Sequence, residues 1–269
     1  MQLTQSILLL AALTTSTFAA SPRPQGFERR QATATTTTSY YASSSSSSGS
    51  DSAWTDLPSG AASTAGFGGV TGSSGSSVTY SGNVGSPYGS NIIEVSADEA
   101  SQYKFVAQFQ GSNTDDWTVA IWNKYGSDGT MNGWYGNACK TFTLSPGSTV
   151  YIAFDDDSQG GWAAAEGSTI PTDSDGGYAS TWGEFDFGST TNNGWSGFDV
   201  SAIQAQNAGL PVQGMEICDA IGGTCSSITA NAASVNNAYT SAEAAVGGIG
   251  GNLDSGNGVR LAVTIDYSG

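Results

Sequence analysis

From about residue 66 onward, short hydrophobic runs alternate with clusters of Gly, Asn, Asp and Ser. Hydrophobic runs of this length, bounded by turn-forming residues, are typical of an antiparallel β-sandwich. The pattern predicts strands at residues 91–95, 105–109, 117–122, 141–144, 150–154, 181–187, 214–217 and 259–267. We therefore expect a mainly β fold.

Helical signals are few. Ser96 and Glu99 form a capping-box pattern that predicts a short helix ending near Tyr103. Hydrophobic residues recur with the spacing of one helical face over residues 228–246 and predict a longer helix in the C-terminal half of the chain. A helical turn is predicted at residues 201–207. The expected fold class is an antiparallel β-sandwich with one such helix and short helical turns.

The first twenty residues have the pattern of a secretion signal. The hydrophobic run at residues 7–12 is far shorter than the roughly 20 apolar residues of a membrane span. Small residues follow it, and Ala19 and Ala20 fit a cleavage site. We expect residues 1–20 to be a signal peptide and the protein to be secreted. The alternative is a buried N-terminal helix.

Two further segments precede the predicted domain. Residues 21–30 end in the dibasic pair Arg29-Arg30, which predicts a pro-segment, with a solvated charge pair as the alternative. Residues 31–65 consist largely of Thr, Ser, Ala and Gly and offer too little apolar surface to offset their ordering entropy. We expect a disordered spacer, a candidate for O-glycosylation, and then a single domain over residues 66–269.

Composition narrows the function further. The chain has no His and a formal net charge of −16. Without His there is no Ser-His-Asp triad, no His-ligated zinc and no imidazole base. The negative charge disfavours nucleic acid and anionic membranes as partners, because phosphates are repelled. Neutral carbohydrate, cations and basic proteins remain as partners, and we expect no cofactor.

Three cysteines remain to be assigned. In an oxidising compartment Cys218 and Cys225 are the expected disulfide, because they close a short loop. Cys139 is then left over, either buried or reactive. A three-thiolate metal site is the competing interpretation.

The most informative segment is the predicted strand at residues 181–187. Trp182, Glu184 and Asp186 share one of its faces, because residues two apart point the same way, and Phe185 and Phe187 point to the core. An aromatic ring beside two carboxylates is typical of a carbohydrate site, since the ring stacks on a sugar and the carboxylates accept hydroxyl hydrogen bonds. The same carboxylates are candidate catalytic groups for glycoside hydrolysis. The plain alternative is a solvated polar face.

Two weaker sets of candidates lie nearby. Asp155, Asp156 and Asp157 follow a predicted strand and are weak calcium-ligand candidates, since oxygen-rich loops bind calcium, but the full twelve-residue loop pattern is absent. Trp162 and Trp195, with Trp134, lie in Gly-rich segments that we expect to be loops. There they are candidates for a sugar-stacking platform, with core packing as the alternative.

Long segments of the chain resemble the secreted fungal Asp f 4-like allergen family. They include YKFVAQFQGSNTDDWTVAIWNKYGSDG, AFDDDSQGGWAAAEG, TWGEFDF and GWSGFDVSAIQAQNAGLPVQGMEIC, and the resemblance extends over nearly all of residues 66–267. It implies an extracellular, immunogenic protein that is recognised by antibodies and associated with the cell wall. It implies no particular biochemical activity.

A fainter resemblance is to thaumatin-like β-sandwich domains, whose acidic cleft binds β-1,3-glucan. The order TWGEFDF, then GFDVSAIQAQNAGLPV, is similar to their pattern and places Glu184 and Asp199 on two cleft acids. The next acid of that pattern falls on Gln204, and the thaumatin-like disulfide framework is absent, which favours binding over hydrolysis.

The sequence therefore predicts a secreted, non-enzymatic module that binds cell-wall glycan such as β-glucan. Its expected site comprises Trp182, Glu184, Asp186 and Asp199, with Trp162 and Trp195 as further ligand-binding candidates. One alternative is a β-1,3-glucan hydrolase that uses Glu184 with Asp199 or Asp186. Another is a surface or effector protein that acts on a protein partner.

Overall fold

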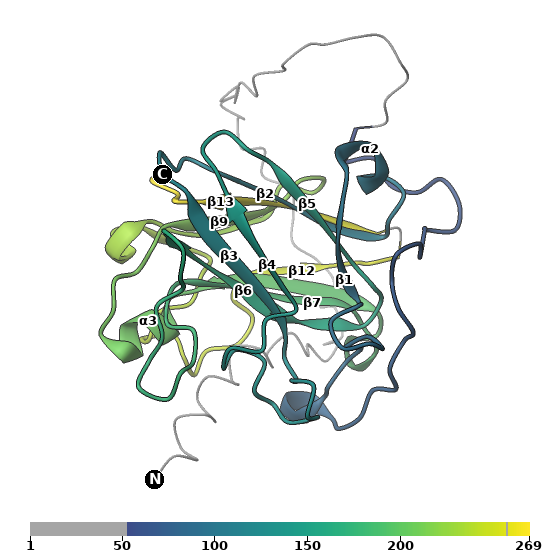
Figure 1. Ribbon diagram of the computed structural model, residues 1–269, viewed down its shortest axis with the longest axis horizontal. Coiled ribbons are helices and arrows are strands. Elements are labelled where there is room, and N and C mark those ends of the chain that lie inside the picture. Colours follow the sequence, from purple (N-terminus) through teal and green to yellow (C-terminus); the bar gives the residue numbers. More distant parts are fainter. Residues whose placement is uncertain (1–52, 257) are drawn as a thin grey trace, which may run out of the picture.

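Two β-sheets packed face to face form the protein (Figure 1). The structure is a computed structural model that describes residues 53–256 and 258–269. The predicted signal peptide, the pro-segment and residues 31–52 of the predicted spacer lie outside the described residues. No helix of the described chain is long and apolar enough to cross a membrane.

One sheet has seven strands. Adjacent strands in this sheet run antiparallel, except for the central pair β2 and β13, which run parallel. In spatial order the strands are β1 (Ile92–Val95), β5 (Val150–Phe154), β2 (Phe105–Gly111), β13 (Val259–Ile265), β9 (Met215–Asp219), β10 (Cys225–Ile228) and β11 (Val235–Asn236).

The second sheet has six strands and is antiparallel throughout. In spatial order the strands are β12 (Gly251–Leu253), β8 (Trp195–Ser201), β7 (Trp182–Ser189), β6 (Ser158–Glu166), β3 (Trp117–Asn123) and β4 (Lys140–Leu144). Along β7, alternate residues point toward the other sheet and away from it, which sets which side chains join the core.

The core fills the space between the sheets. Phe185 and Phe187 of β7 are buried there, as the alternation predicted, and their rings pack on Phe154 with centroids 4.8 Å and 4.9 Å away. Trp162 packs against Phe185 in the same layer, with ring centroids 5.7 Å apart. This aromatic layer anchors β7, and with it the outward-facing residues of that strand.

The mainly β sandwich prediction is confirmed, and each predicted strand corresponds to a strand of the structure. Three strands of four residues or more, β6, β8 and β10, were not predicted from the sequence. Strand β6 has the sequence SQGGWAAAE, which contains no β-branched residue, so local propensity does not mark it as a strand. Its strand conformation comes from pairing with β3 and β7 on its two sides.

The longer helix predicted for residues 228–246 is absent. Ile228 ends β10, a single turn η3 (Ala230–Ala232) follows, and the chain then forms β11. Asn231, Ala232 and Asn237 have φ values of 57°, 54° and 48°, which a right-handed helix does not accommodate. The prediction was wrong because the hydrophobic residues have the spacing of a helical face, while the backbone changes direction at residues with positive φ.

The short helical elements lie at the margins of the sheets. The capping box between Ser96 and Glu99 is present at α2 (Ala97–Ala100), as predicted. The turn predicted at residues 201–207 is α3 (Ile203–Ala208), which ends at Gly209 in the left-handed conformation. Single turns are η1 (Ser77–Thr79) and η2 (Thr190–Asn192).

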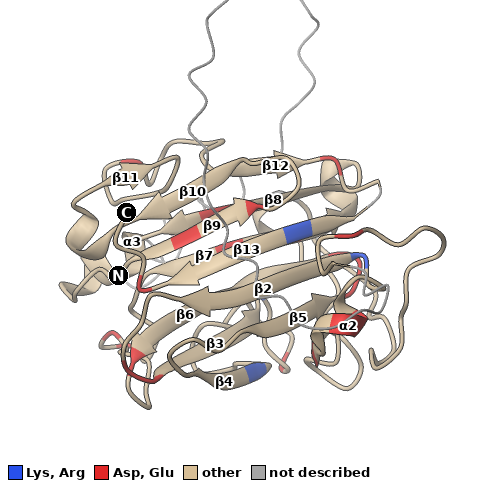
Figure 2. Ribbon diagram, turned by 90° about the horizontal axis from the view of Figure 1, so that it is seen from above, with Lys and Arg blue, Asp and Glu red and all other residues tan. Residues whose placement is uncertain are grey.

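Residues 54–63, which the sequence analysis assigned to the spacer, pack on the seven-stranded sheet. Arg260 of β13 (Figure 2) is fully buried on the face away from the core, and its guanidinium donates to Trp54 O at 2.8 Å and Asp56 O at 2.7 Å. The Trp54 ring lies 6.0 Å from the Tyr151 ring. The packed part of the chain therefore begins before residue 66.

Candidate functional site

Strands β7 and β8 bring three acidic residues together on the outer face of the six-stranded sheet. Glu184 and Asp186 lie two residues apart on β7, and Asp199 of β8 is the register partner of Glu184. Opposite residues of an antiparallel pair have Cα atoms about 4.5 to 5.5 Å apart. The sequence predicted the shared face of Glu184 and Asp186, and the strand pairing adds Asp199 beside them.

The carboxyl groups of Glu184 and Asp199 are hydrogen-bonded to each other and shielded from solvent. The two residues are only 3% and 7% exposed. Since a carboxylate only accepts hydrogen bonds, one member of this pair holds a proton. We name Glu184, Asp186 and Asp199 the acid cluster.

Burial shifts the titration of all three acids upward. It raises the pKa of Glu184 to about 7, an effect that the hydrogen bond from Asp199 and the charge of Lys124 partly oppose. It also raises the pKa of Asp186 to about 7. The pKa of Asp199 lies well above its ordinary value, through burial and the adjacent Glu184 charge. Glu184 and Asp199 therefore titrate as a coupled pair that retains a proton to higher pH than free carboxyl groups do.

One oxygen of each acid lacks a hydrogen-bond partner among the described residues. These are Glu184 Oε2, Asp186 Oδ1 and Asp199 Oδ1, all shielded from solvent. A buried acceptor without a donor costs roughly 1 to 3 kcal/mol. The acid cluster is thus an unsatisfied group of acceptors rather than a solvated polar face.

Lys124, which the sequence analysis did not single out, supplies the nearby positive charge. It follows β3 directly, is 2% exposed, and its Nζ donates to Tyr80 O at 2.9 Å. Burial lowers its pKa to about 8, while the charges of Asp186 and Glu184 act in the opposite direction. The sequence did contain a signal for Lys124, because basic residues are rare in this chain: Lys and Arg together number seven.

Trp182 is buried instead of forming an open stacking surface. It is 2% exposed and packs against Trp122 and Trp134, with ring centroids 5.1 Å and 6.0 Å away. Its indole N–H donates to Tyr178 O at 2.9 Å. Trp162 was expected in a loop but lies in β6 with 0% exposure. For Trp182 and Trp162 the core-packing alternative therefore holds, because neither ring has a face that a sugar could reach in this conformation.

Trp195 is the exposed ring of the predicted platform. All seven Trp residues lie in the described part of the chain. Among them only Trp195 has an exposed side chain, with 39% of its surface accessible to solvent. It begins β8 after the polar turn Thr190–Asn192, Asn193 and Gly194. Period-two alternation places Trp195 on the same face of β8 as Asp199. The exposed ring and the acid cluster therefore share one sheet face.

The three consecutive acids predicted as weak metal ligands take separate partners. Asp155 accepts from Asn83 Nδ2 at 3.1 Å, and Asp156 pairs with Lys104 Nζ at 2.7 Å. Asp157 accepts from the Tyr80 hydroxyl and from Ser73 Oγ. Their carboxylates are not gathered into a ligand set in the described structure.

The predicted disulfide between Cys218 and Cys225 is present and joins register partners on β9 and β10. Glu216 lies beside the disulfide. Together with Cys218 and Cys225 it forms the one cluster of three potential metal-ligating residues among residues 53–256 and 258–269. Both sulfurs are bonded to each other in the disulfide and are therefore not available to a metal ion. Cys139 is a free thiol within that range, partly buried, and burial raises its pKa.

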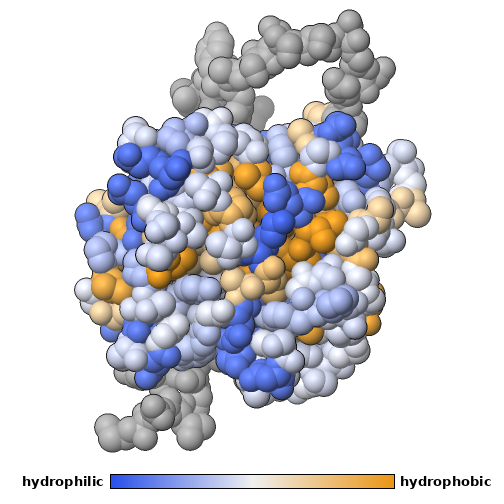
Figure 3. Space-filling view, in the orientation of Figure 1, coloured by the Kyte–Doolittle hydropathy of each residue, from blue (hydrophilic) through white to orange (hydrophobic). Residues whose placement is uncertain are grey.

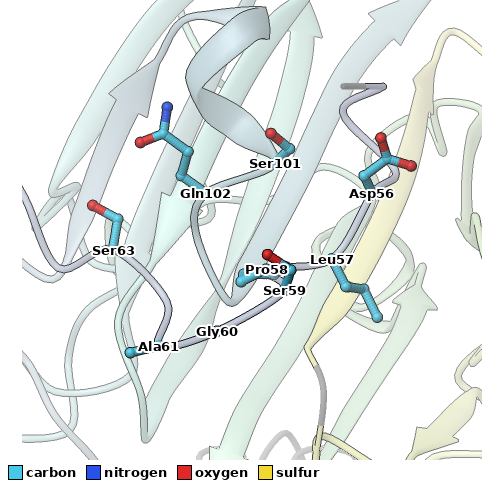
Figure 4. Close-up of a pocket in the computed structure, with 9 residues that line it drawn as sticks. All are labelled: Asp56, Leu57, Pro58, Ser59, Gly60, Ala61, Ser63, Ser101 and Gln102. Atoms are coloured by element: carbon cyan, nitrogen blue, oxygen red, sulfur yellow. The ribbon is translucent and has the colours of Figure 1, made fainter. Parts of the chain in front are cut away.

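A surface pocket lies away from all of these residues. Figure 4 shows it between the segment that packs on the seven-stranded sheet and the end of α2. Its lining is Asp56, Leu57, Pro58, Ser59, Gly60, Ala61, Ser63, Ser101 and Gln102. It contains no aromatic ring and no basic side chain, and none of the predicted site residues.

The edges of the two sheets at β1 and β4 form another face of the molecule (Figure 3). Hydrophobic and strongly hydrophilic residues are interspersed there. Lys140 of β4 and Glu94 of β1 form an ion pair of 3.0 Å that joins the two edges. This face offers no exposed aromatic platform among the residues described there.

Residues 90–265 match the family model described as the Allergen Asp f 4-like domain. The chain is also 55% identical over 220 residues to Allergen Asp f 4 of Aspergillus fumigatus, covering 81% of this chain and 68% of that protein. The crystal structure of the protein elicitor MoHrip2 from Magnaporthe oryzae aligns with a TM-score of 0.38 and 13% identity, over 60% of this chain and 98% of that one. A likeness at that TM-score supports no conclusion.

Proposed function

The chain belongs to the Allergen Asp f 4-like family, and from this premise we propose that it is a secreted, wall-associated protein that binds a neutral polysaccharide such as β-glucan. Membership makes it a fungal allergen-like protein, and recognition by antibodies is proposed on the same ground. The disulfide between Cys218 and Cys225 is compatible with secretion, since such bonds persist in oxidising compartments.

The observation that carries the proposal is the exposed indole of Trp195 at the start of β8, next to a polar turn. Thr190, Thr191 and Asn193 around it are exposed, and Asn252 on the adjacent strand β12 is also exposed. An indole stacks on the apolar face of a sugar ring, and hydroxyl and amide side chains exchange hydrogen bonds with sugar hydroxyls. This combination suits a neutral carbohydrate.

Charge supports a neutral ligand over an anionic one. The formal net charge of −16 repels polyanions, whereas an uncharged glucan pays no such electrostatic cost. Trp195 also lies on the sheet face that holds the acid cluster, so a chain of sugars bound at the indole runs over the same sheet.

Hydrolysis is the alternative, and the contact between Glu184 and Asp199 disfavours this pair for it. Retaining glycosidases separate their carboxyl groups by about 5 to 5.5 Å and inverting ones by about 6.5 to 9.5 Å. The hydrogen bond between Glu184 and Asp199 holds their carboxyl groups closer together than either of these separations. Glu184 with Asp186 is the remaining pair for a hydrolase.

Co-sedimentation with insoluble β-1,3-glucan tests the proposal. We expect the wild-type protein in the pellet, no soluble sugar in the supernatant, and at least a tenfold loss of retention in Trp195→Ala. Val235→Ala is the matched control, because Val235 is a similarly exposed hydrophobic residue, at 41%, on β11 of the other sheet. Equal retention of the two variants would contradict the role of Trp195.

The same experiment separates the alternatives. Soluble oligosaccharide that disappears in Glu184→Gln would identify a hydrolase. Protein that stays wholly in solution without releasing sugar would reject both glucan functions and favour a protein partner.

The predicted processing remains part of the proposal. Residues 1–20 are proposed as the signal peptide, 21–30 as the pro-segment and 31–52 as the remaining spacer, ahead of the packed chain. N-terminal sequencing of the secreted protein tests this, with Gln31 as the expected first residue.

A further inference from the structure

Lys124, Gln159 and Asp186 lie side by side across three adjacent strands of the six-stranded sheet. Lys124 directly follows β3, and its backbone N–H donates to Gln159 O of β6 at 2.8 Å. Gln159 is in turn the register partner of Asp186 on β7. Because residues directly opposite each other in an antiparallel sheet point to the same face, the three side chains form one row on the outer face.

Within this row a buried amine meets a buried carboxamide. Lys124 and Gln159 are only 2% and 6% exposed. Lys124 Nζ donates to Gln159 Oε1 at 3.5 Å, and the carbon that an amine attacks, Gln159 Cδ, is bonded directly to this oxygen. Groups held about 3 to 3.5 Å apart react as though their effective concentration were very high. The contact therefore places a nucleophile beside an electrophile.

The nitrogen of the same carboxamide faces β7. Gln159 Nε2 donates to Ser189 Oγ at 3.4 Å. The side chains of Ser189 and Gln159 also hydrogen-bond to the Asp186 carboxyl group, whose Oδ1 is shielded from solvent and has no partner among the described residues. The carboxamide thus lies between an amine on one side and a carboxyl group on the other.

The protonation states suit a reaction between these groups. Burial lowers the pKa of Lys124 to about 8, against the charges of Asp186 and Glu184. Burial also raises the pKa of Asp186 to about 7, an effect that hydrogen bonds and the Lys124 charge oppose and the Asp157 charge reinforces. Near neutral pH the chain therefore populates both a neutral amine, which is nucleophilic, and a protonated carboxyl group, which can donate to a leaving group.

We propose that Lys124 and Gln159 react with each other to form an intramolecular amide cross-link, an isopeptide bond, between β3 and β6. Nζ of the neutral amine attacks Cδ, the Nζ–Cδ bond forms, and the Cδ–Nε2 bond breaks. Asp186 donates its proton to Nε2, which leaves as ammonia, and takes up the proton that Nζ loses. The reaction needs no oxidant and no other reactant. The positive charge of Lys124 described above belongs to the unlinked chain.

The cross-link has a physical consequence that is independent of sugar binding. It closes a loop between positions 35 apart in sequence, whereas the disulfide joins positions only 7 apart. A cross-link stabilises a fold mainly by restricting the unfolded chain, and more so for a longer loop. It also replaces a buried ammonium group, which is costly to desolvate, by a neutral amide.

Peptide mapping of the secreted protein by mass spectrometry tests the proposal. Trypsin cleaves after free Lys and Arg, so a linked Lys124 is not cleaved. After reduction of the disulfide, we expect peptide 105–140 joined to peptide 141–260. The joined species is expected to weigh about 17 Da less than the sum of its parts, because ammonia is lost. Recovery of the separate peptide 105–124 in place of the joined species would overturn the cross-link.

Variants assign the atoms involved. Lys124→Arg keeps the charge but removes the nucleophilic amine, so no joined peptide is expected, whereas the matched control Lys104→Arg changes a largely exposed lysine and retains it. Asp186→Asn is expected to lower the joined fraction at least about tenfold through loss of the proton donor. Glu166→Gln, an exposed acid on β6, is its control.

The outcomes decide the two parts of the proposal separately. A joined peptide in Lys124→Arg would show that another residue forms the link. An equal joined fraction in Asp186→Asn and wild type would overturn the role of Asp186. Mapping of the wild-type protein decides whether the bond exists even where a variant fails to fold.

Discussion

Glu184 and Asp199 stand directly opposite each other on β7 and β8, and their carboxyl groups share a hydrogen bond in a part of the sheet face closed to solvent. A side-by-side pair of buried carboxyl groups is stable only while it holds a proton, since two like charges in contact repel strongly. The native state therefore retains a proton that the unfolded chain releases.

Stability is expected to decrease as pH rises from about 4 to 8. Folding raises the pKa values of Glu184 and Asp186 to about 7, and it raises that of Asp199 well above its ordinary value. Groups with a raised native pKa stabilise the fold below their unfolded pKa, and this contribution is lost as pH rises through the native pKa. Each contributes a slope of up to about 1.4 kcal/mol per pH unit.

The charges that face the acid cluster modify this slope. Lys124 favours the ionised acids, and Asp157 disfavours ionisation of Asp186. Thermal denaturation between pH 4 and pH 8 measures the effect. A melting temperature that rises over this interval would contradict the protonated pair.

Glu184→Gln is expected to flatten the pH dependence. The amide is neutral at every pH and can donate to Asp199, so the variant melts higher than wild type at pH 8 and about equally at pH 4. The exposed residue Glu166, at the end of β6, provides the control Glu166→Gln. Identical pH profiles for wild type and Glu184→Gln would show that the pair does not set the slope.

Arg260→Met is expected to destabilise the fold by about 3 kcal/mol or more. The guanidinium donates to the carbonyls of Trp54, Asp56, Tyr103, Lys104 and Val259, and its loss leaves several of these acceptors buried without a donor. Urea denaturation measures the change.

Lys104→Met is the control for this substitution, because Lys104 forms a largely exposed ion pair with Asp156. Pairs of this kind contribute about 1 kcal/mol or less. Proteolysis within residues 54–63 is expected to increase in Arg260→Met alone. Equal stability of the two variants would show that Arg260 does not hold this segment.

Trp182→Ala and Trp195→Ala are expected to separate a packing role from a surface role. Trp182 is buried among aromatic rings, so its truncation costs about 3 to 5 kcal/mol. Trp195 is exposed, so its truncation changes stability by about 0.5 kcal/mol or less. Denaturant midpoints of the two variants check this, and a large loss in Trp195→Ala would indicate that the ring supports the fold.

Removal of the disulfide by the double substitution Cys218→Ser and Cys225→Ser is expected to destabilise the fold by about 2 kcal/mol. The loss is modest because the bond spans only seven positions of sequence, within a hairpin already paired by its backbone. Cys139→Ser controls for loss of a thiol outside the hairpin. An unchanged denaturant midpoint in the double variant would show that the bond adds nothing to the hairpin.

Much of the fold could be predicted because strand alternation is a local property. It located β7 and placed Phe185 and Phe187 in the core. It failed at β6, where Gly and Ala carry no strand preference and pairing partners decide the conformation. It also failed at residues 228–246, where residues with positive φ interrupt an apparently helical spacing.

The sequence by itself determined the β-sandwich class, the family and the common face of Trp182, Glu184 and Asp186, because these depend on composition, motif and period. Only the tertiary structure decided that Asp199 lies opposite Glu184, that Lys124 lies close to both acids of β7, and that Trp182 is buried while Trp195 is exposed. The physical reason is that strand pairing and packing bring together residues that are distant in sequence. Local patterns do not record which segment covers which part of a sheet.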